Sequence, residues 1–108
     1  MNYTFAVQNN TLIVYVYGEL DMMLTEPLKA AIDAILNVRS IRNVTFDFSH
    51  VTFIDSSGLG MILSRYKSLA ELGGKVNIIE ADEQVYKILK LSGFDKIITI
   101  EKSYGIAK

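Results

Sequence analysis

Residues 44–60 read VTFDFSHVTFIDSSGLG, a segment that contains an expected strand followed by an expected helix start. Its first five positions alternate apolar and polar side chains, which is the two-residue period of a strand with one buried face. Over residues 56–72 apolar side chains recur at intervals of three and four, the period of an amphipathic helix. We expect residues 50–55 to form a short loop between the two. A buried strand that leads directly into a helix is typical of an α/β sheet.

The same periods predict the other elements on both sides of this segment. Strands are expected at residues 3–8, 12–17, 75–80 and 96–101, and helices at residues 24–38 and 82–91. Asn9 and Asn10 tolerate positive φ and predict a tight hairpin turn. The second strand is apolar on both faces and is therefore expected to be central, and Gly18 is expected to end it. Thr25 or a neighbour is expected to cap the first helix. The order β-β-α-β-α-β-α-β predicts an α/β fold, with a mixed, mostly parallel sheet, helices packed on it and room for a short terminal helix.

Composition limits the function classes. The 108 residues suffice for a single domain, 1–108, and 11 basic against 12 acidic residues leave no basic face for nucleic acid. The chain has no cysteine and one histidine, so we expect no disulfide, no thiolate chemistry and no metal site. The longest apolar run, Leu12 to Tyr17, is far shorter than the roughly 20 residues of a membrane span, and residues 1–4 lack the order of a signal peptide. We therefore expect a cytoplasmic protein without membrane contact.

The loop before the second helix carries Asp55, Ser56, Ser57 and Gly58. It follows the carboxyl end of a strand, where open α/β sheets place their working residues, and a helix start stabilises an anion. The two serines therefore offer hydroxyls where a phosphate would be stabilised, and the glycines at 58 and 60 would let another backbone or a nucleotide approach. The alternative is that Asp55 and the two serines merely cap the helix. The residues alone decide neither between these interpretations nor between the serines.

Enzymatic motifs are missing from the sequence. A serine hydrolase would need the pattern Gly-x-Ser-x-Gly around its nucleophile. Asp55 stands where Ser57 would need glycine, and Ser56 has no glycine two positions before it either. Its base would have to be His50, the sole histidine. No phosphate-binding Gly-x-x-x-x-Gly-Lys run and no Gly-x-Gly-x-x-Gly run occurs. We expect no enzymatic activity, and a serine hydrolase remains a remote alternative.

Three segments together carry a family resemblance. They are Gly-Glu-Leu-Asp at 18–21, Phe-Ile-Asp-Ser-Ser-Gly-Leu-Gly at 53–60, and Leu-Ser-Gly at 91–93. In this order and at these separations, the chain closely resembles the STAS domain of anti-sigma-factor antagonists, and most closely those of sporulation. The resemblance covers nearly the whole chain. One departure is Met22-Met23, where relatives commonly carry more polar residues; this pair either alters the partner surface or packs into the core.

The resemblance implies a phosphorylation switch. Ser56 would be phosphorylated by the anti-sigma factor, a serine protein kinase that itself binds the ATP or ADP, so the chain needs no cofactor of its own. The unphosphorylated form would bind this kinase and release a sporulation sigma factor, and a serine phosphatase would reset the phosphorylated form. The partner-binding residues would be Glu19, Asp21, Asp55, Ser57, Gly58 and Leu59, although Glu19 and Asp21 can also be plain turn and cap residues. A STAS regulatory module of a stress-signalling or transport system is the alternative within the fold.

Overall fold

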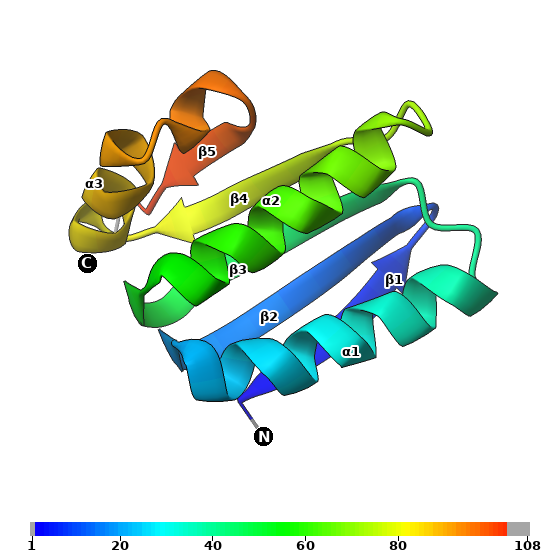
Figure 1. Cartoon of the computed structure of the whole chain (residues 1–108), viewed down its shortest axis with the longest axis horizontal. Helices are drawn as coiled ribbons and strands as arrows, with labels where there is room; N and C mark the ends of the chain where they lie inside the picture. The colour runs from blue at the N-terminus through cyan, green and yellow to red at the C-terminus, as the bar shows by residue number, and fades with distance from the viewer. Residues whose placement is uncertain (1, 104–108) are drawn as a thin grey trace.

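Five strands form one mixed sheet in the computed structural model, which describes residues 2–103 (Figure 1). The strands lie in chain order: β1 (Tyr3–Gln8), β2 (Thr11–Leu20), β3 (Asn43–Ile54), β4 (Val76–Ala81) and β5 (Thr99–Lys102). β1 pairs with β2 in antiparallel fashion, and the other pairs are parallel. This arrangement confirms the predicted mixed sheet, which an antiparallel hairpin opens. The hairpin turn contains Asn9 at a φ of 58°, in the left-handed region that asparagine tolerates.

The described helices connect the parallel strands and lie on one face of the sheet. They are α1 (Met22–Val38), α2 (Ser56–Ala70), α3 (Glu83–Leu91) and the short 3₁₀ helix η1 (Phe94–Lys96). Right-handed crossovers between strands that follow one another in the same direction place all their helices on the same side. In Figure 1 α1 and α2 run across this face of the sheet, and α3 lies beside the carboxyl end of β4.

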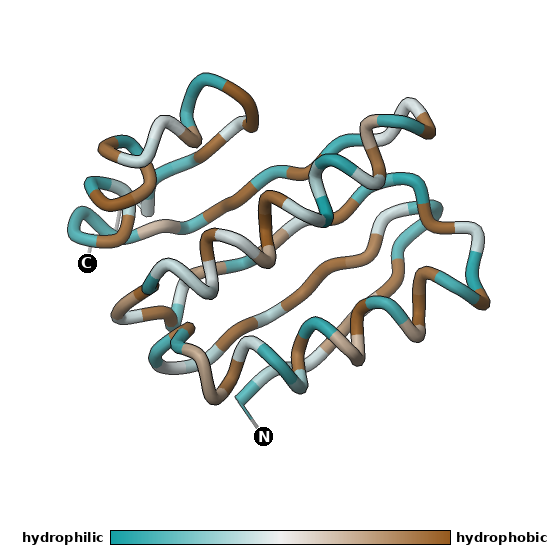
Figure 2. The backbone as a smooth tube through the Cα atoms, viewed as in Figure 1, coloured by the Kyte–Doolittle hydropathy of each residue, from teal (hydrophilic) through white to brown (hydrophobic). Residues whose placement is uncertain are grey.

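The core fills the space between this sheet face and the helices. Every second residue of β2 and of the first part of β3 is buried, which is the predicted strand period. Hydrophobic residues concentrate along β2, β3 and β4, whereas the helices alternate between hydrophobic and hydrophilic residues (Figure 2). The largest fully buried side chains include Phe46, Phe48, Leu12, Leu28, Ile32, Ile62 and Ile78. On the second face of the sheet, Ile13 and Tyr15 of β2 are only half-buried. β2 is therefore central, as its sequence predicted, but only one of its two apolar faces is fully buried.

β3 is longer than predicted. Residues 50–54 continue the strand instead of forming a loop, and Val51 and Ile54 are buried. The alternation breaks at Ser49 and His50 because the pairing with β2 shifts register there, so the buried positions no longer follow the simple period. β2 likewise runs past Gly18 to Leu20. Gly18 adopts a φ of 96° beside a second register shift, so it marks an irregularity within the strand and not its end.

Two other boundaries differ from the sequence prediction. α1 begins at Met22 with Asp21 as its cap, because the Asp21 carboxylate accepts a hydrogen bond from the N–H of Leu24. Thr25 was expected near the cap but is buried inside the first turn. Residues 94–96 form η1, so β5 begins only at Thr99. The predicted short terminal helix falls on residues 104–108, outside the described part of the chain.

Candidate functional site

The carboxyl ends of β2 and β3 bring the two family-like segments together. In the parallel pair, Glu19 is aligned with Phe53 and Leu20 with Ile54. One residue further on, the backbone N–H of Asp55 donates to the carbonyl oxygen of Leu20 over 3.2 Å. The loop after β2 and the loop after β3 therefore adjoin, and the starts of α1 and α2 lie next to each other (Figure 1).

Asp55 caps α2. Its Oδ1 accepts hydrogen bonds from the N–H of Ser57 at 2.9 Å and from the N–H of Gly58 at 3.1 Å. The pKa of Asp55 is lowered, chiefly because the Ser57 hydroxyl donates to the carboxylate; burial acts against this, and the backbone N–H groups of Gly58, Ser57 and Met22 act with it. The Asp55 carboxylate therefore stabilises the start of α2, and Met22, the first residue of α1, lies near it.

The two serines have different environments. The Ser57 side chain is half-buried, and its hydroxyl donates to Asp55 Oδ1 at 2.5 Å and lies 3.4 Å from the Thr25 hydroxyl. Thr25 in turn donates to the carbonyl of Asp21 at 2.7 Å, so the hydroxyl hydrogen of each residue is used at the start of its own helix, and the Ser57–Thr25 pair is a close contact between α2 and α1. Ser56 is exposed, and its hydroxyl makes no hydrogen bond with any residue in the range 2–103. Of the two serines, Ser56 is thus the one that presents a free hydroxyl to an incoming protein.

Glu19 and Asp21 lie beside this loop. Glu19 is exposed, and Asp21 is half-buried because its carboxylate caps α1. Both line one open hollow of about 580 Å³ together with Tyr3, Met23 and other residues of β1 and α1. Asp21 is therefore a helix cap, as the plain alternative had predicted, and it also lines this open hollow.

Gly58 lets another part of the backbone approach closely, one of the two roles that the sequence suggested for it. It is buried, and a Cβ at this position would lie 2.9 Å from the carbonyl oxygen of Leu20 and 2.9 Å from side-chain atoms of Leu20 and Ile54. The backbone that approaches Gly58 so closely is thus the chain's own β2. Leu59 is half-buried against the core, and a Cβ at Gly60 would meet nothing within 4 Å.

Exposed apolar side chains occur at the start of α1 and at the end of β3, and sequence analysis identified them only in part. Met22 is 67% exposed, Met23 is 86% exposed and Phe53 is 40% exposed. The suggestion that Met22-Met23 packs into the core is therefore wrong. Phe53 was missed because the segment was expected to be a loop; its exposure follows from the register shift in β3. Thr25 was considered only as a cap. Its hydroxyl instead donates to the backbone carbonyl of Asp21, four residues earlier, a bond that threonine side chains in helices often make.

His50 has its contacts elsewhere. Its Nδ1 lies 3.2 Å from the Ser49 hydroxyl, and its ring centroid lies 5.2 Å from that of Tyr17. No hydrogen bond joins it to Ser56 among the residues described. Across residues 2–103 there is also no group of three or more His, Asp or Glu side chains that could hold a metal ion. No helix of that part of the chain has the length and apolar character needed to cross a membrane.

Comparison with known proteins places this fold and site in a family. The family model of the STAS domain matches residues 2–107, and the chain therefore belongs to the STAS domain family. Within it, the chain is similar to the anti-sigma F factor antagonist of Paenibacillus polymyxa, with 34% identity over 82% of this chain and 76% of the relative. It is also similar to the anti-sigma-B factor antagonist of Listeria monocytogenes, with 24% identity over 85% of this chain and 80% of the relative. The solved structure of the antagonist SpoIIAA in its unphosphorylated form superposes with a TM-score of 0.81, at 24% identity, over 91% of this chain and 86% of that one, which confirms the fold.

Proposed function

We propose that this protein is an anti-sigma-factor antagonist, a regulatory binding protein that phosphorylation of Ser56 switches off. The observation that carries the proposal is the contrast between the two serines. The Ser57 hydroxyl is held by Asp55, whereas Ser56 is exposed at the start of α2 with a free hydroxyl. A protein kinase must bring its substrate hydroxyl to the γ-phosphate of ATP, which favours the free hydroxyl over the bound one.

The relatives support the type of partner. The two relatives described above are named antagonists of anti-sigma factors, and identity is higher to the anti-sigma F antagonist, at 34%, than to the anti-sigma-B antagonist, at 24%. The unphosphorylated form would bind an anti-sigma factor that is also a serine kinase, and so release a sporulation sigma factor. A serine phosphatase would restore that form. ATP and ADP would be bound by the kinase, so this chain requires no cofactor.

The local geometry suggests how a phosphate would act. The N–H groups of Ser57 and Gly58 already donate to the Asp55 carboxylate, and the N–H of Leu59 donates to the Asp55 carbonyl. The start of α2 therefore has few donors left for a phosphate, which would point to solvent and leave the fold intact. It would add about 1.5 to 2 negative charges beside the carboxylate of Asp55.

Those charges would act on the complex and not on the monomer. Asp55 directly precedes Ser56, and Glu19 and Asp21 belong to the loop after β2, which adjoins the loop of Ser56, so this end of the molecule already carries three carboxylates. In the free protein, water screens the added charge. A partner docked over Ser56 would remove that water, and burying an unpaired charge in an interface is costly. Phosphorylation would thus dissociate the partner while the antagonist stays folded.

Mass spectrometry tests the site directly. The purified protein is incubated with ATP and its cognate anti-sigma kinase, and the phosphorylated peptide is mapped. We expect one phosphate on Ser56, a Ser57→Ala variant that is still phosphorylated, and a Ser56→Ala variant that is not. A phosphate on Ser57, Thr52 or Tyr66 would contradict the assignment, and the absence of phosphate on any residue would contradict the kinase mechanism.

A further inference from the structure

Two exposed methionines begin α1, at the end of the molecule that carries Ser56. Met22 and Met23 are both strongly exposed, and neither packs into the hydrophobic core. Burial of such an apolar side chain in an interface is favourable, and the flexible thioether adapts to an irregular partner surface. Exposed apolar residues that occur singly are common on proteins, so the pair is informative only if it lies beside a functional residue.

The contacts between α1 and α2 fix how the two helices lie side by side. At their starts, the Ser57 hydroxyl lies 3.4 Å from the Thr25 hydroxyl. Further along both helices, Arg65 forms an ion pair with Asp33 over 3.4 Å. In each pair the two residues are 32 positions apart in the chain, so the helices run parallel and in constant register.

This register places Met22 next to Ser56. Met22 lies three positions before Thr25, and residues three apart share one face of a helix, so Met22 continues the face of α1 that contacts α2. By the same register its counterpart is the end of β3, directly before Asp55 and Ser56. The N–H of Met22 also contributes to the lowered pKa of Asp55, which requires the two residues to be close. The starts of the two helices are neighbours in Figure 1 as well.

Met23 extends this apolar surface along α1. It lines the open hollow of about 580 Å³ that Glu19 and Asp21 also line, so the surface has an acidic edge. The exposed Phe53 does not belong to it. Ile54 is buried in the core beneath the helices, and successive residues of a strand point to opposite faces of the sheet.

From this placement we infer that Met22 and Met23 are the apolar anchor with which this protein binds its anti-sigma factor, against an apolar patch on that partner. The inference rests on the proposed function. A kinase that reaches the Ser56 hydroxyl must also cover its neighbours, because a specific interface buries roughly 800 Å² on each partner. Methionine is enriched at the centre of such interfaces, where water is excluded. The carboxylates at the edge favour basic side chains around the partner's patch.

Calorimetric titration against the anti-sigma factor, with ADP present, tests the anchor. Met22→Gln and Met23→Gln keep the length of the side chain but replace the thioether by a polar amide. Each should weaken binding by about tenfold, because the burial of a methionine side chain contributes at least that factor. Neither variant changes a charge, so the loss should persist at high salt. Met22→Leu stays apolar and should bind nearly as the wild type does.

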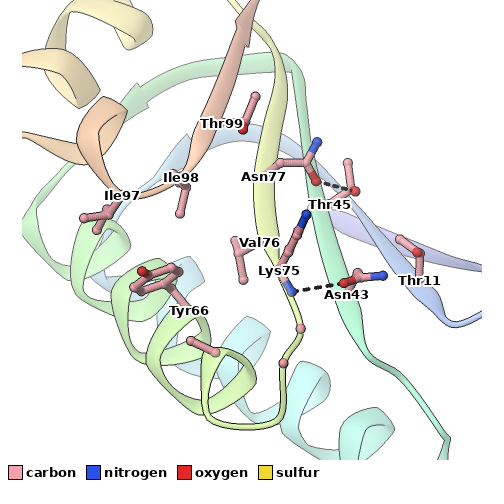
Figure 3. A pocket seen from close by; sticks show the side chains of 13 residues that line it. Thr11, Asn43, Thr45, Tyr66, Lys75, Val76, Asn77, Ile97, Ile98 and Thr99 are labelled. Atoms are coloured by element: carbon pink, nitrogen blue, oxygen red, sulfur yellow. Dashed lines mark hydrogen bonds between the residues drawn. The ribbon is translucent and has the colours of Figure 1, made fainter.

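The matched control is Leu72→Gln. Leu72 is 70% exposed, as Met22 nearly is, but it lies in the turn between α2 and Lys75, at the opposite end of the sheet (Figure 3). It should bind like the wild type, and all variants should melt near the wild-type temperature. The inference is overturned if either glutamine variant at 22 or 23 binds as tightly as the wild type, if Leu72→Gln weakens binding as much, or if the loss disappears at high salt. Wild-type binding separates the two levels: if it is present while the methionine variants bind normally, only this inference fails, and if it is absent, the proposed function fails as well.

Discussion

The Ser57 hydroxyl donates a hydrogen bond to the Asp55 carboxylate over 2.5 Å, and this contact distinguishes two adjacent serines that the sequence cannot separate. The bond holds Ser57 inward, next to Thr25, and leaves the neighbouring Ser56 as the exposed hydroxyl. It also stabilises the charged form of Asp55, whose pKa is lowered. The same hydrogen bond therefore leaves Ser56 as the free hydroxyl of the pair and keeps a negative charge beside it.

Charge at Ser56 should act on binding and leave stability almost unchanged. Asp55 is the cap and Ser56 the first helical residue, so Ser56→Ala should change the free energy of unfolding by less than about 0.5 kcal/mol. This is smaller than the roughly 0.5 to 2 kcal/mol that the loss of a cap would cost. Ser56→Asp should keep the fold or stabilise it slightly, since an acidic group suits a helix start. Affinity for the anti-sigma factor with ADP present should fall roughly 5- to 150-fold in Ser56→Asp relative to Ser56→Ala.

The control for this comparison is Ser64→Asp. It adds the same charge on an exposed position further along α2 and should bind like the wild type. Titration of the three variants by calorimetry, with melting curves for each, separates the two effects. Equal affinities of Ser56→Ala and Ser56→Asp would show that charge at this position is not the switch.

Two glycines of α2 should respond oppositely to alanine. In Gly58→Ala the new Cβ would meet atoms of Leu20 and Ile54 at 2.9 Å, so the variant should lose about 1 to 3 kcal/mol of stability through overpacking. Gly60 is exposed and a Cβ there meets nothing within 4 Å, so Gly60→Ala should gain about 0.5 to 1 kcal/mol from helix propensity. Urea denaturation measures both. A neutral Gly58→Ala would show that the loops after β2 and β3 can separate without cost.

The contribution of Asp55 to stability should depend on pH in one direction. Its pKa in the folded protein is lowered from the ordinary value of 3.8, so the charged carboxylate stabilises the fold fully above that value. This contribution is lost as the pH falls below 3.8 and through the folded pKa. The difference in unfolding free energy between wild type and Asp55→Asn should thus be constant from about pH 5 to 7 and shrink in acid. Urea curves at several pH values measure it, and a difference that grows in acid would refute the assigned cause.

His50 should be dispensable for the switch. Its contacts are with Ser49 and Tyr17, so His50→Gln should leave phosphorylation of Ser56 and binding of the anti-sigma factor nearly unchanged. Ser56→Ala serves as the negative control in the kinase assay. If a folded His50→Gln variant lost both properties, an active role for the histidine, as in the serine hydrolase alternative, would have to be reconsidered.

The sequence predicted those features that depend on periodicity. The alternation of residues 44–48 identified β3, the helical spacing after Ser56 identified α2, and the element order gave the mixed sheet. Register shifts were not predictable, because a bulge depends on the pairing of two strands and not on either one alone. The exposure of Phe53 and the extension of β2 beyond Gly18 follow from such shifts.

The site was predicted at the level of its loop but not of its contacts. The Asp-Ser-Ser-Gly sequence located a helix start, and the resemblance selected Ser56. The orientation of Ser57, the burial of Gly58 and the role of Thr25 arise from the contact between the ends of β2 and β3, which joins residues far apart in the chain.

The strand order has a consequence for how the protein forms during synthesis. Because each strand pairs with its predecessor in the chain, the sheet can grow from β1 onward while the ribosome is still adding residues. The hairpin, α1, β3 and the start of α2 already contain Ser56 and the residues that hold its loop in place. The edge of the sheet formed by β4 and β5 must wait for the residues that follow α2. The loop that carries Ser56 is thus synthesised in full before the last two strands of the sheet.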